Sequence, residues 1–348
     1  NDEKIFCLME DQQAPARKKP PTKLKNPKLF KPFEMYVKMY GLPAYNEMDP
    51  TWFVAITYFF IFGAMFGDVG QGLILFLGGL FLYKTKHMDL AGIISCAGVF
   101  SVFFGFMYGS FFGFEDVLKA IWLKPMNQMM DVPLVGRLNA VFVIAIGFGM
   151  FIILICMVFN IINSIRRGDT EKTWFDSNAV AGLVFYGSIV LTIGLFISGK
   201  KLPAAAILVI MFGVPLLLMF LKEPLTNLVE KKSKILPEQK GMFFVQSFFE
   251  LFEVLLSYLS NTLSFLRIGA FAVSHAAMME VVLMLAGATN GGSPNWVVVV
   301  LGNIFVCAME GLIVGIQVLR LEYYEIFSRF YAGNGREFKP FMKAAHKN

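Results

Sequence analysis

The sequence predicts an all-α polytopic membrane protein with about eight transmembrane helices, of which the last two are long and strongly tilted. Three observations support this class: 56% of the 348 residues are hydrophobic, the mean hydropathy is +0.61, and only 16% of the residues are charged. Soluble proteins of this length carry more charge. The 38 Phe and 31 Gly residues fit the same class, because bulky rings face lipid and small residues let helices approach closely.

A membrane-spanning helix needs about 20 apolar residues, and eight segments are interpreted as spans on this basis. They cover residues 52–66, 69–83, 90–112, 138–163, 178–198, 203–221, 241–286 and 296–330. The first two share one apolar stretch, interrupted by turn-forming residues at Gly67 and Asp68, which predicts a tight helical hairpin with Asp68 in its turn near the outer surface. The last two exceed a bilayer thickness, which predicts strong tilt.

The distribution of basic residues predicts the orientation, because cytoplasmic loops carry the excess of Lys and Arg. With both ends placed inside, 24 of the 31 Lys and Arg residues fall in inner segments and five in outer loops. The remaining two, Arg267 and Arg320, lie within the last two spans. We therefore expect an integral, multi-pass protein with both ends of this segment cytoplasmic.

Three regions are predicted along the chain. Residues 1–50 are polar and rich in Lys and Pro, which is typical of a linker, and we expect them to end a truncated N-terminal cytoplasmic domain. Residues 51–330 are expected to form a transmembrane domain, and residues 331–348 a cytoplasmic C-terminal tail. The four cysteines show no CxxC pair, so no metal site or disulfide is predicted.

Polar residues form a stripe along each of the last two spans. Glu253, Ser257, Ser260, Ser264 and Arg267 follow steps of three and four residues, which places them on one helical face. In the last span, Asn303, Glu310 and Gln317 recur every seven residues, and Arg320 comes three residues after Gln317. Lipid cannot hydrogen-bond such groups, so the two stripes predict a buried, wet seam.

The charges along this seam predict a function for the two arginines. An arginine at membrane depth costs several kcal/mol, although Arg267 as a structural ion pair and Arg320 as an interfacial anchor remain open alternatives. Glu253 lies on the inner side of the arginines, and Glu310 and His275 lie on the outer side. Acidic groups on both sides of a basic centre exclude a simple cation pore, so a moving partner must carry the ion past the centre.

Several motifs resemble the membrane domain of the V/A-type ATPase subunit a, which is called subunit I in prokaryotes. They are SNTLSFLRIGAFAVSH at 260–275, MEGL at 309–312, QVLRLEYYE at 317–325, DPTW at 49–52 and MFGDVGQG at 65–72. The resemblance covers nearly everything from about residue 40 to the end. The residues that follow Arg267, IGAFA, are similar to those of the prokaryotic branch of this family. This similarity implies a prokaryotic cell membrane.

The resemblance implies a role for each site residue. Arg267 and Arg320 would meet the carboxylate of a rotor ring of small membrane subunits, with Gln317 beside them. Glu253 would line the cytoplasmic half-channel, and Glu310 with His275 the outer one. Further lining residues are expected to be Ser257, Ser260, Ser264 and Asn303. Peripheral stalk subunits would bind the missing N-terminal part. No catalytic site, cofactor, metal or nucleic-acid partner is implied in this chain.

Other interpretations are less favoured. Gly194, Gly199 and Lys200 have the spacing of a phosphate-binding loop. However, Lys201 stands where that motif requires Ser or Thr. His87 and His346 lie in a loop and the tail, which argues against haem ligation. An autonomous secondary transporter that binds an anionic substrate through the two arginines is the main alternative, but no internal repeat is visible. The choice between H⁺ and Na⁺ stays open.

Overall fold

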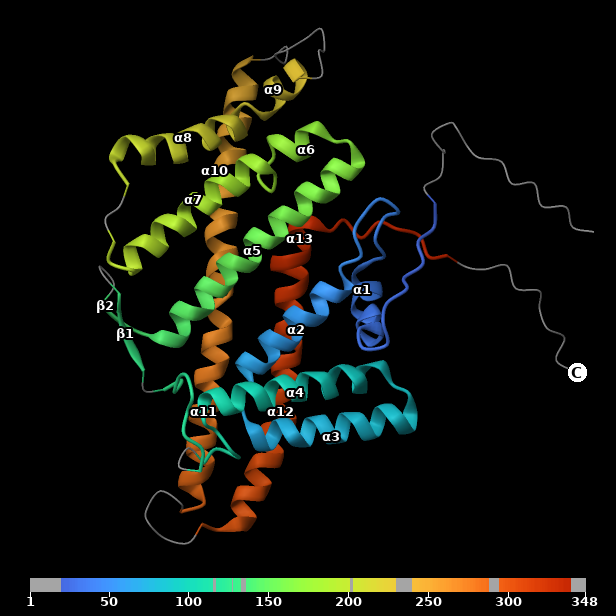
Figure 1. Ribbon diagram of the computed structural model, residues 1–348, viewed down its shortest axis with the longest axis vertical. Helices are drawn as coiled ribbons and strands as arrows, with labels where there is room; N and C mark the ends of the chain where they lie inside the picture. The colour runs from blue at the N-terminus through green and yellow to red at the C-terminus, as the bar shows by residue number, and fades with distance from the viewer. Residues whose placement is uncertain are drawn as a thin grey trace, which may run out of the picture.

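The computed structural model describes residues 20–114, 117–126, 128–132, 136–200, 203–229, 240–287 and 294–338. This part of the chain is mostly helical (Figure 1). The main helices are α1 Glu34–Tyr40, α2 Thr51–Met65, α3 Val69–Lys86, α4 Asp89–Tyr108, α5 Ala140–Arg167, α6 Thr170–Trp174, α7 Val180–Ile197, α8 Ala205–Phe220, α9 Lys222–Val229, α10 Lys240–Ser264, α11 Leu266–Leu285 and α12 Trp296–Arg320. Two short strands, β1 Met129–Val132 and β2 Gly136–Asn139, pair antiparallel in the connection before α5.

The predicted hairpin between the first two spans is wrong, because α3 packs along α4 and not along α2. Figure 1 shows α3 and α4 side by side, while α2 lies at an angle to α3 and also packs on α4. Glycines explain this pairing: a Cβ on Gly79 would lie 2.7 Å from the Ser95 nitrogen, and a Cβ on Gly98 would lie 2.5 Å from the Phe76 nitrogen. These glycines let the α3 and α4 backbones approach closely.

The fold class is confirmed, but the count of eight spans is not. Among the described residues, five helices are long and apolar enough to cross a membrane, or six if α8 and α9, which meet at a bend of 74°, form one span. With 15 residues, α2 is shorter than a full crossing. The helix α3 ends in a polar turn that contains Lys84 and Lys86.

The last two spans are long, as predicted. Helices α10 and α11 form one apolar helix of 45 residues, Gly241–Leu285, interrupted only at the buried Phe265. Its length is about 68 Å at 1.5 Å per residue, roughly twice the hydrocarbon thickness. The second is Trp296–Phe330, with 35 residues, in which α12 continues through a π-helix, η3 Leu321–Phe327, into α13 Ser328–Phe330. Both run steeply across α3 and α4 in Figure 1, and their tilt in the membrane stays a prediction.

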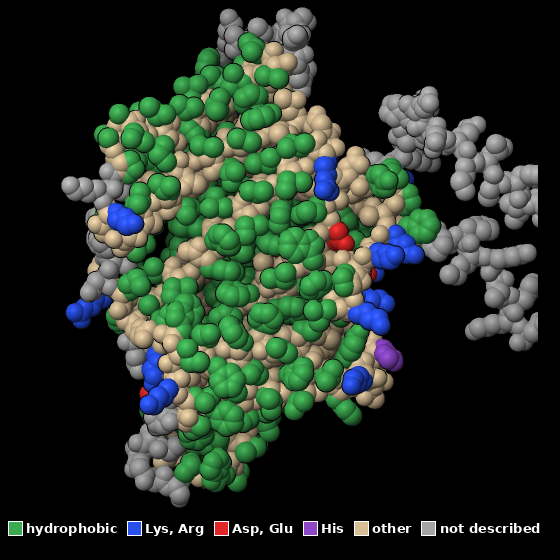
Figure 2. All heavy atoms as spheres, viewed as in Figure 1, with side chains coloured by type: hydrophobic (Ala, Val, Ile, Leu, Met, Phe, Trp, Pro, Cys, Tyr) green, Lys and Arg blue, Asp and Glu red, His purple; other side chains and the backbone are tan. Residues whose placement is uncertain are grey.

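The molecule has a hydrophobic face between two basic margins. Figure 2 shows hydrophobic side chains across this face and most Lys and Arg side chains at its left and right edges. The main hydrophobic core lies inside the molecule, where α2 packs against α4, α11, α12 and η3. An apolar band with charges at both edges is the surface expected in a bilayer.

Both ends of the described chain lie at the same margin (Figure 1). Thr22 N donates to the Arg336 carbonyl at 2.7 Å, and Gly335 N donates to the Leu42 carbonyl at 2.8 Å. The hydroxyl of Tyr331 donates to the Gly41 carbonyl at 2.5 Å. These contacts join segment 20–50 to the start of the tail. Residues 1–19 of the predicted linker and 339–348 of the predicted tail lie outside the described residues, and the cytoplasmic location of the ends stays a prediction.

Candidate functional site

Arg267 lies in the first turn of α11, directly after the interruption at Phe265. Its Nη2 donates to Ser264 Oγ at 3.2 Å, and the Ser264 hydroxyl donates in turn to Glu325 Oε1. No ion pair joins Arg267 to a carboxylate in the described part of the chain, and Arg267 Nη1 is buried without a hydrogen-bond partner there. The structural ion pair considered for Arg267 is therefore absent, and Ser264 stands between the two charges.

Arg320 is exposed at the last turn of α12. Its guanidinium makes neither a hydrogen bond nor an ion pair with any described residue, although it lies within electrostatic range of Arg267 and of the Glu325 carboxylate. Gln317, one turn earlier, is half-buried and likewise makes no hydrogen bond to the described residues. Two neighbouring guanidiniums repel each other, so an anionic group from outside this chain would be stabilised between them.

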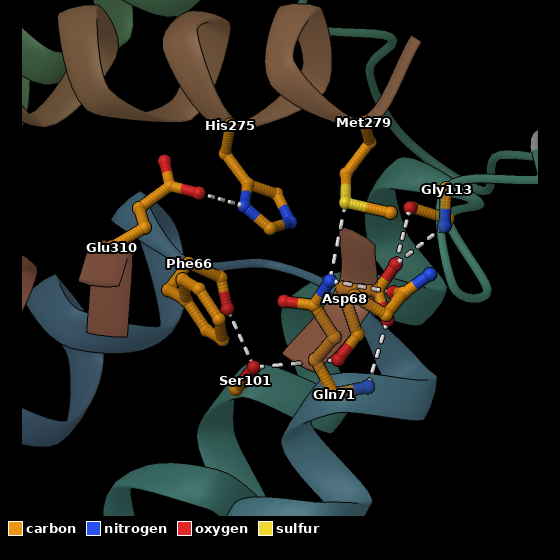
Figure 3. Close-up of polar contacts among 10 residues, drawn as sticks. Phe66, Asp68, Gln71, Ser101, Gly113, His275, Met279 and Glu310 are labelled. Atoms are coloured by element: carbon orange, nitrogen blue, oxygen red, sulfur yellow. Dashed lines mark hydrogen bonds and ion pairs between the residues drawn. The ribbon is translucent and has the colours of Figure 1, made fainter. Parts of the chain in front are cut away.

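His275 and Glu310 form a buried pair between α11 and α12 (Figure 3). His275 Nδ1 and Glu310 Oε2 are 2.7 Å apart, and the imidazole packs on the Phe66 ring at a centroid distance of 4.7 Å. Within the described structure, His275 Nε2 and Glu310 Oε1 are buried without partners. The predicted outer residues therefore do meet, although they are 35 positions apart in the sequence.

A second polar cluster lies next to this pair and contains the predicted Asn303. Gln71 Nε2 donates to Asn303 Oδ1 at 2.8 Å and contacts Met279 Sδ at 3.1 Å, and Asn303 Nδ2 donates to the Val299 carbonyl at 2.9 Å. The sequence did not single out Gln71. Its spacing alone gives no signal, since it lies on the first turn of a different helix, α3.

Asp68 has a structural role, as the sequence suggested, and its position near the outer surface stays a prediction. Its side chain is fully buried and caps α3 by accepting from Gln71 N at 2.9 Å. It also accepts from Ser110 Oγ at 2.7 Å and from the backbone nitrogens of Phe112 and Gly113 at 3.1 Å each. Figure 3 shows this carboxylate beside Gly113. Asp68 thus fixes the loop after α4 against the start of α3.

The predicted inner residues border a polar cavity of about 310 Å³ between α10, α13 and the segment before α7. Glu253 is exposed and Ser257 half-buried on this wall. Ser260 is exposed and does not line the cavity, so the α10 stripe does not face a single space. The lining residues are Ser177, Asn178, Glu250, Glu253, Val254, Ser257, Asn261, Ser328 and Arg329.

The sequence interpretation missed three buried charged residues after Arg320. Glu325 contacts Ser264, and Glu322 is fully buried with neither carboxylate oxygen bonded to a described residue. Arg329, which the count of basic residues placed on the inner side, is only 6% exposed and lies in α13. The signal was the spacing of three and four residues from Glu322 to Arg329, which continues a helical polar pattern.

Comparison with known proteins places these residues in a family. The model of the V-type ATPase 116kDa subunit family matches residues 3–131 and 222–343. The A-type ATP synthase subunit I of Pyrococcus horikoshii is 30% identical over 341 residues, which cover 92% of this chain and 47% of the relative. The subunit I of Aeropyrum pernix is 29% identical over 361 residues, covering 92% and 51%. The chain thus spans about half the length of the curated relatives that it matches.

Proposed function

Because the chain belongs to the V-type ATPase 116kDa subunit family, we propose that it is the ion-translocating part of a rotary ATPase stator. In this proposal the chain hydrolyses nothing itself. It forms two ion half-channels against a rotor ring of small, carboxylate-bearing membrane subunits. Peripheral stalk subunits bind the part of the protein that precedes residues 1–50. The tail and residues 1–50 lie in the cytoplasm of a prokaryotic cell.

One observation carries this proposal: neither Arg267 nor Arg320 forms an ion pair with a described carboxylate of its own chain. Arg320 is exposed and Arg267 is held only through Ser264. A ring carboxylate that crosses lipid is most stable when it is neutral and loaded with H⁺ or Na⁺. Beside these guanidiniums its ionised form is favoured, so the ion is released. Arginine suits this role because it stays protonated.

The acidic groups on either side supply the two half-channels. Glu253 borders the inner cavity, whose lining includes Ser328 and Arg329 in α13, just before the tail. Glu310 and His275 lie further along α11 and α12, away from that cavity. Since the arginines stand between the two groups, an ion cannot pass directly and must travel around on the ring. A secondary transporter would place polar groups in two corresponding halves, whereas here they concentrate in α10 to α13.

The test compares Arg267→Ala and Arg267→Lys in the assembled ATPase, reconstituted into liposomes. Arg267→Ala should abolish ATP-driven ion uptake while leaving the subunit composition unchanged. Arg267→Lys keeps a charge and should retain more uptake than Ala, but less than the wild type, since the guanidinium offers more donors. Full ATP-driven uptake with Arg267→Ala would overturn the proposal.

A further inference from the structure

Arg329 is a buried cation that pairs with no carboxylate among the residues the structure describes. Its Nη1 donates to Asn178 Oδ1 at 2.9 Å, and its Nη2 donates to Ser257 Oγ at 3.4 Å. The guanidinium carbon lies 5.3 Å from the centre of the Tyr258 ring, and Nε is buried without a partner among the described residues. Burying a charge on neutral dipoles alone costs several kcal/mol. A residue with such an unfavourable burial free energy usually has a role other than stabilising the fold.

The charges around the inner cavity suggest this role. Three charged residues line it: Glu250, Glu253 and Arg329. Glu250 is already neutralised by an ion pair with Lys222. Glu253 and Arg329 therefore remain as the two lining charges that form no ion pair with a described residue, and their charges are opposite in sign. Without Arg329 the same cavity would carry a net negative charge and several oxygen ligands, which favours the binding of metal cations.

We propose that Arg329 balances the charge of Glu253 in the inner cavity and thereby keeps metal cations such as Na⁺ out, so that protons are the ions that enter. This inference rests on the proposed function. Protons do not need a site for a bare cation, because they move between water, hydroxyl and carboxylate groups. At 310 Å³ the cavity has room for several waters, each of which occupies about 30 Å³ in the liquid. A unit charge about 4 Å away changes the local concentration of another ion roughly fivefold even in bulk water.

The charge can be measured without relying on transport. Ser257→Cys places a thiol at the hydrogen-bonding partner of Arg329, in a chain whose four native cysteines are replaced by Ala. The rates of modification by an anionic and a cationic methanethiosulfonate are compared in the assembled ATPase, because their ratio cancels changes in thiol reactivity. Arg329→Gln should lower the anionic-to-cationic ratio at least about tenfold, whereas Arg329→Lys should leave it within about twofold. An unchanged ratio with Arg329→Gln would overturn the inference.

A control on the same helix covers the case in which Arg329→Gln does not assemble. Ser260→Cys lies one turn away, is exposed and does not line the cavity. With Arg329 intact, the ratio at Ser257→Cys should exceed that at Ser260→Cys about fivefold. Equal ratios would contradict an effect of Arg329.

Transport then tests the ion preference. ATP-driven proton uptake is recorded with choline replaced by Na⁺ at constant ionic strength. The wild type and Arg329→Lys should be unaffected, and Arg329→Gln should be slowed severalfold in Na⁺ only. Insensitivity of Arg329→Gln, or Na⁺ uptake by the wild type, would overturn the inference. If either of these results is found while Arg267→Ala still abolishes all uptake, the inference about Arg329 fails but the proposed stator function stands.

Discussion

His275 Nδ1 lies 2.7 Å from Glu310 Oε2, and the two side chains are only 3% and 4% exposed. Each residue keeps one buried polar atom that forms no hydrogen bond with a described residue. We propose that the pair acts as one proton-binding unit.

The first prediction concerns this unit. Glu310→Gln and His275→Ala should each reduce ATP-driven uptake at least about tenfold, and the double variant should be no worse than the more damaging single variant. Groups that act as a unit are non-additive when removed together. Uptake is measured in liposomes, with Glu280→Gln as the control because Glu280 is an exposed carboxylate on the same helix. Additive losses in the double variant would show that the two residues act separately.

The partners of Arg267 could be predicted only in part from the sequence. Helical spacing placed Ser264 and Arg267 on one face, and they do form a hydrogen bond. The helical face on which Glu325 lies could not be predicted in the same way, because Leu321–Phe327 is a π-helix. Each turn of a π-helix contains more residues than the 3.6 of an α-helix. The position of Glu325 opposite Ser264 follows from this local change in winding.

Helical spacing also could not predict the contacts between helices that are distant in the sequence. The repeat of seven placed Asn303 and Glu310 on one face of α12, but it could not show that Asn303 meets Gln71. Nor did the turn residues at Asp68 reveal that α3 pairs with α4, since that pairing depends on glycines that match across two helices. Sequence patterns indicate which face is polar, whereas tertiary packing decides what that face meets.

The second prediction concerns Ser264, which separates Arg267 from Glu325. Ser264→Ala removes the hydroxyl that bonds both side chains, so Arg267 should turn toward Glu325 and become less available to an outside carboxylate. We expect ATP-driven uptake to fall about threefold to tenfold, an effect of about 1 kcal/mol, as for one hydrogen bond. Ser260→Ala is the matched control, because Ser260 is exposed and lies on the same helix. Equal effects of the two substitutions would rule out this role.

The third prediction separates structure from transport at Asp68. Asp68→Asn replaces one acceptor oxygen with an NH₂ group among four donors, of which three are backbone amides. At least one donor then stays unsatisfied, at a cost of about 1–3 kcal/mol. The melting temperature in detergent should fall, whereas Asp89→Asn in the exposed first turn of α4 should change it little. Lost uptake at an unchanged melting temperature would instead place Asp68 in the ion path.

The fourth prediction tests the contact between the segment before α2 and the tail. Gly41 has φ +148, and a Cβ there would lie 2.2 Å from the Gly333 carbonyl oxygen. Gly41→Ala should therefore destabilise this contact by about 1–3 kcal/mol through backbone strain, in addition to the clash. Limited proteolysis of residues 331–338 measures the opening. Gly147→Ala is the control, because no atom lies near its Cβ position within α5. Equal protection of the two variants would contradict the close approach.

The fifth prediction is a pH dependence of the same contact. Burial raises the pKa of the Tyr331 phenol above its usual range, and its hydroxyl donates to the Gly41 carbonyl. Because the pKa is higher in the folded state, the neutral phenol stabilises the contact fully below about pH 10, the ordinary tyrosine value. This stability is lost as the pH rises from there toward the folded-state pKa. Hydrogen exchange of residues 331–338 should therefore accelerate above about pH 10 more than the normal hydroxide catalysis of exchange explains. Tyr331→Phe cannot ionise and should remove that excess, although it weakens the contact at every pH. If the excess persists in Tyr331→Phe, the neighbouring Tyr40, whose pKa burial also raises, becomes the group to substitute next.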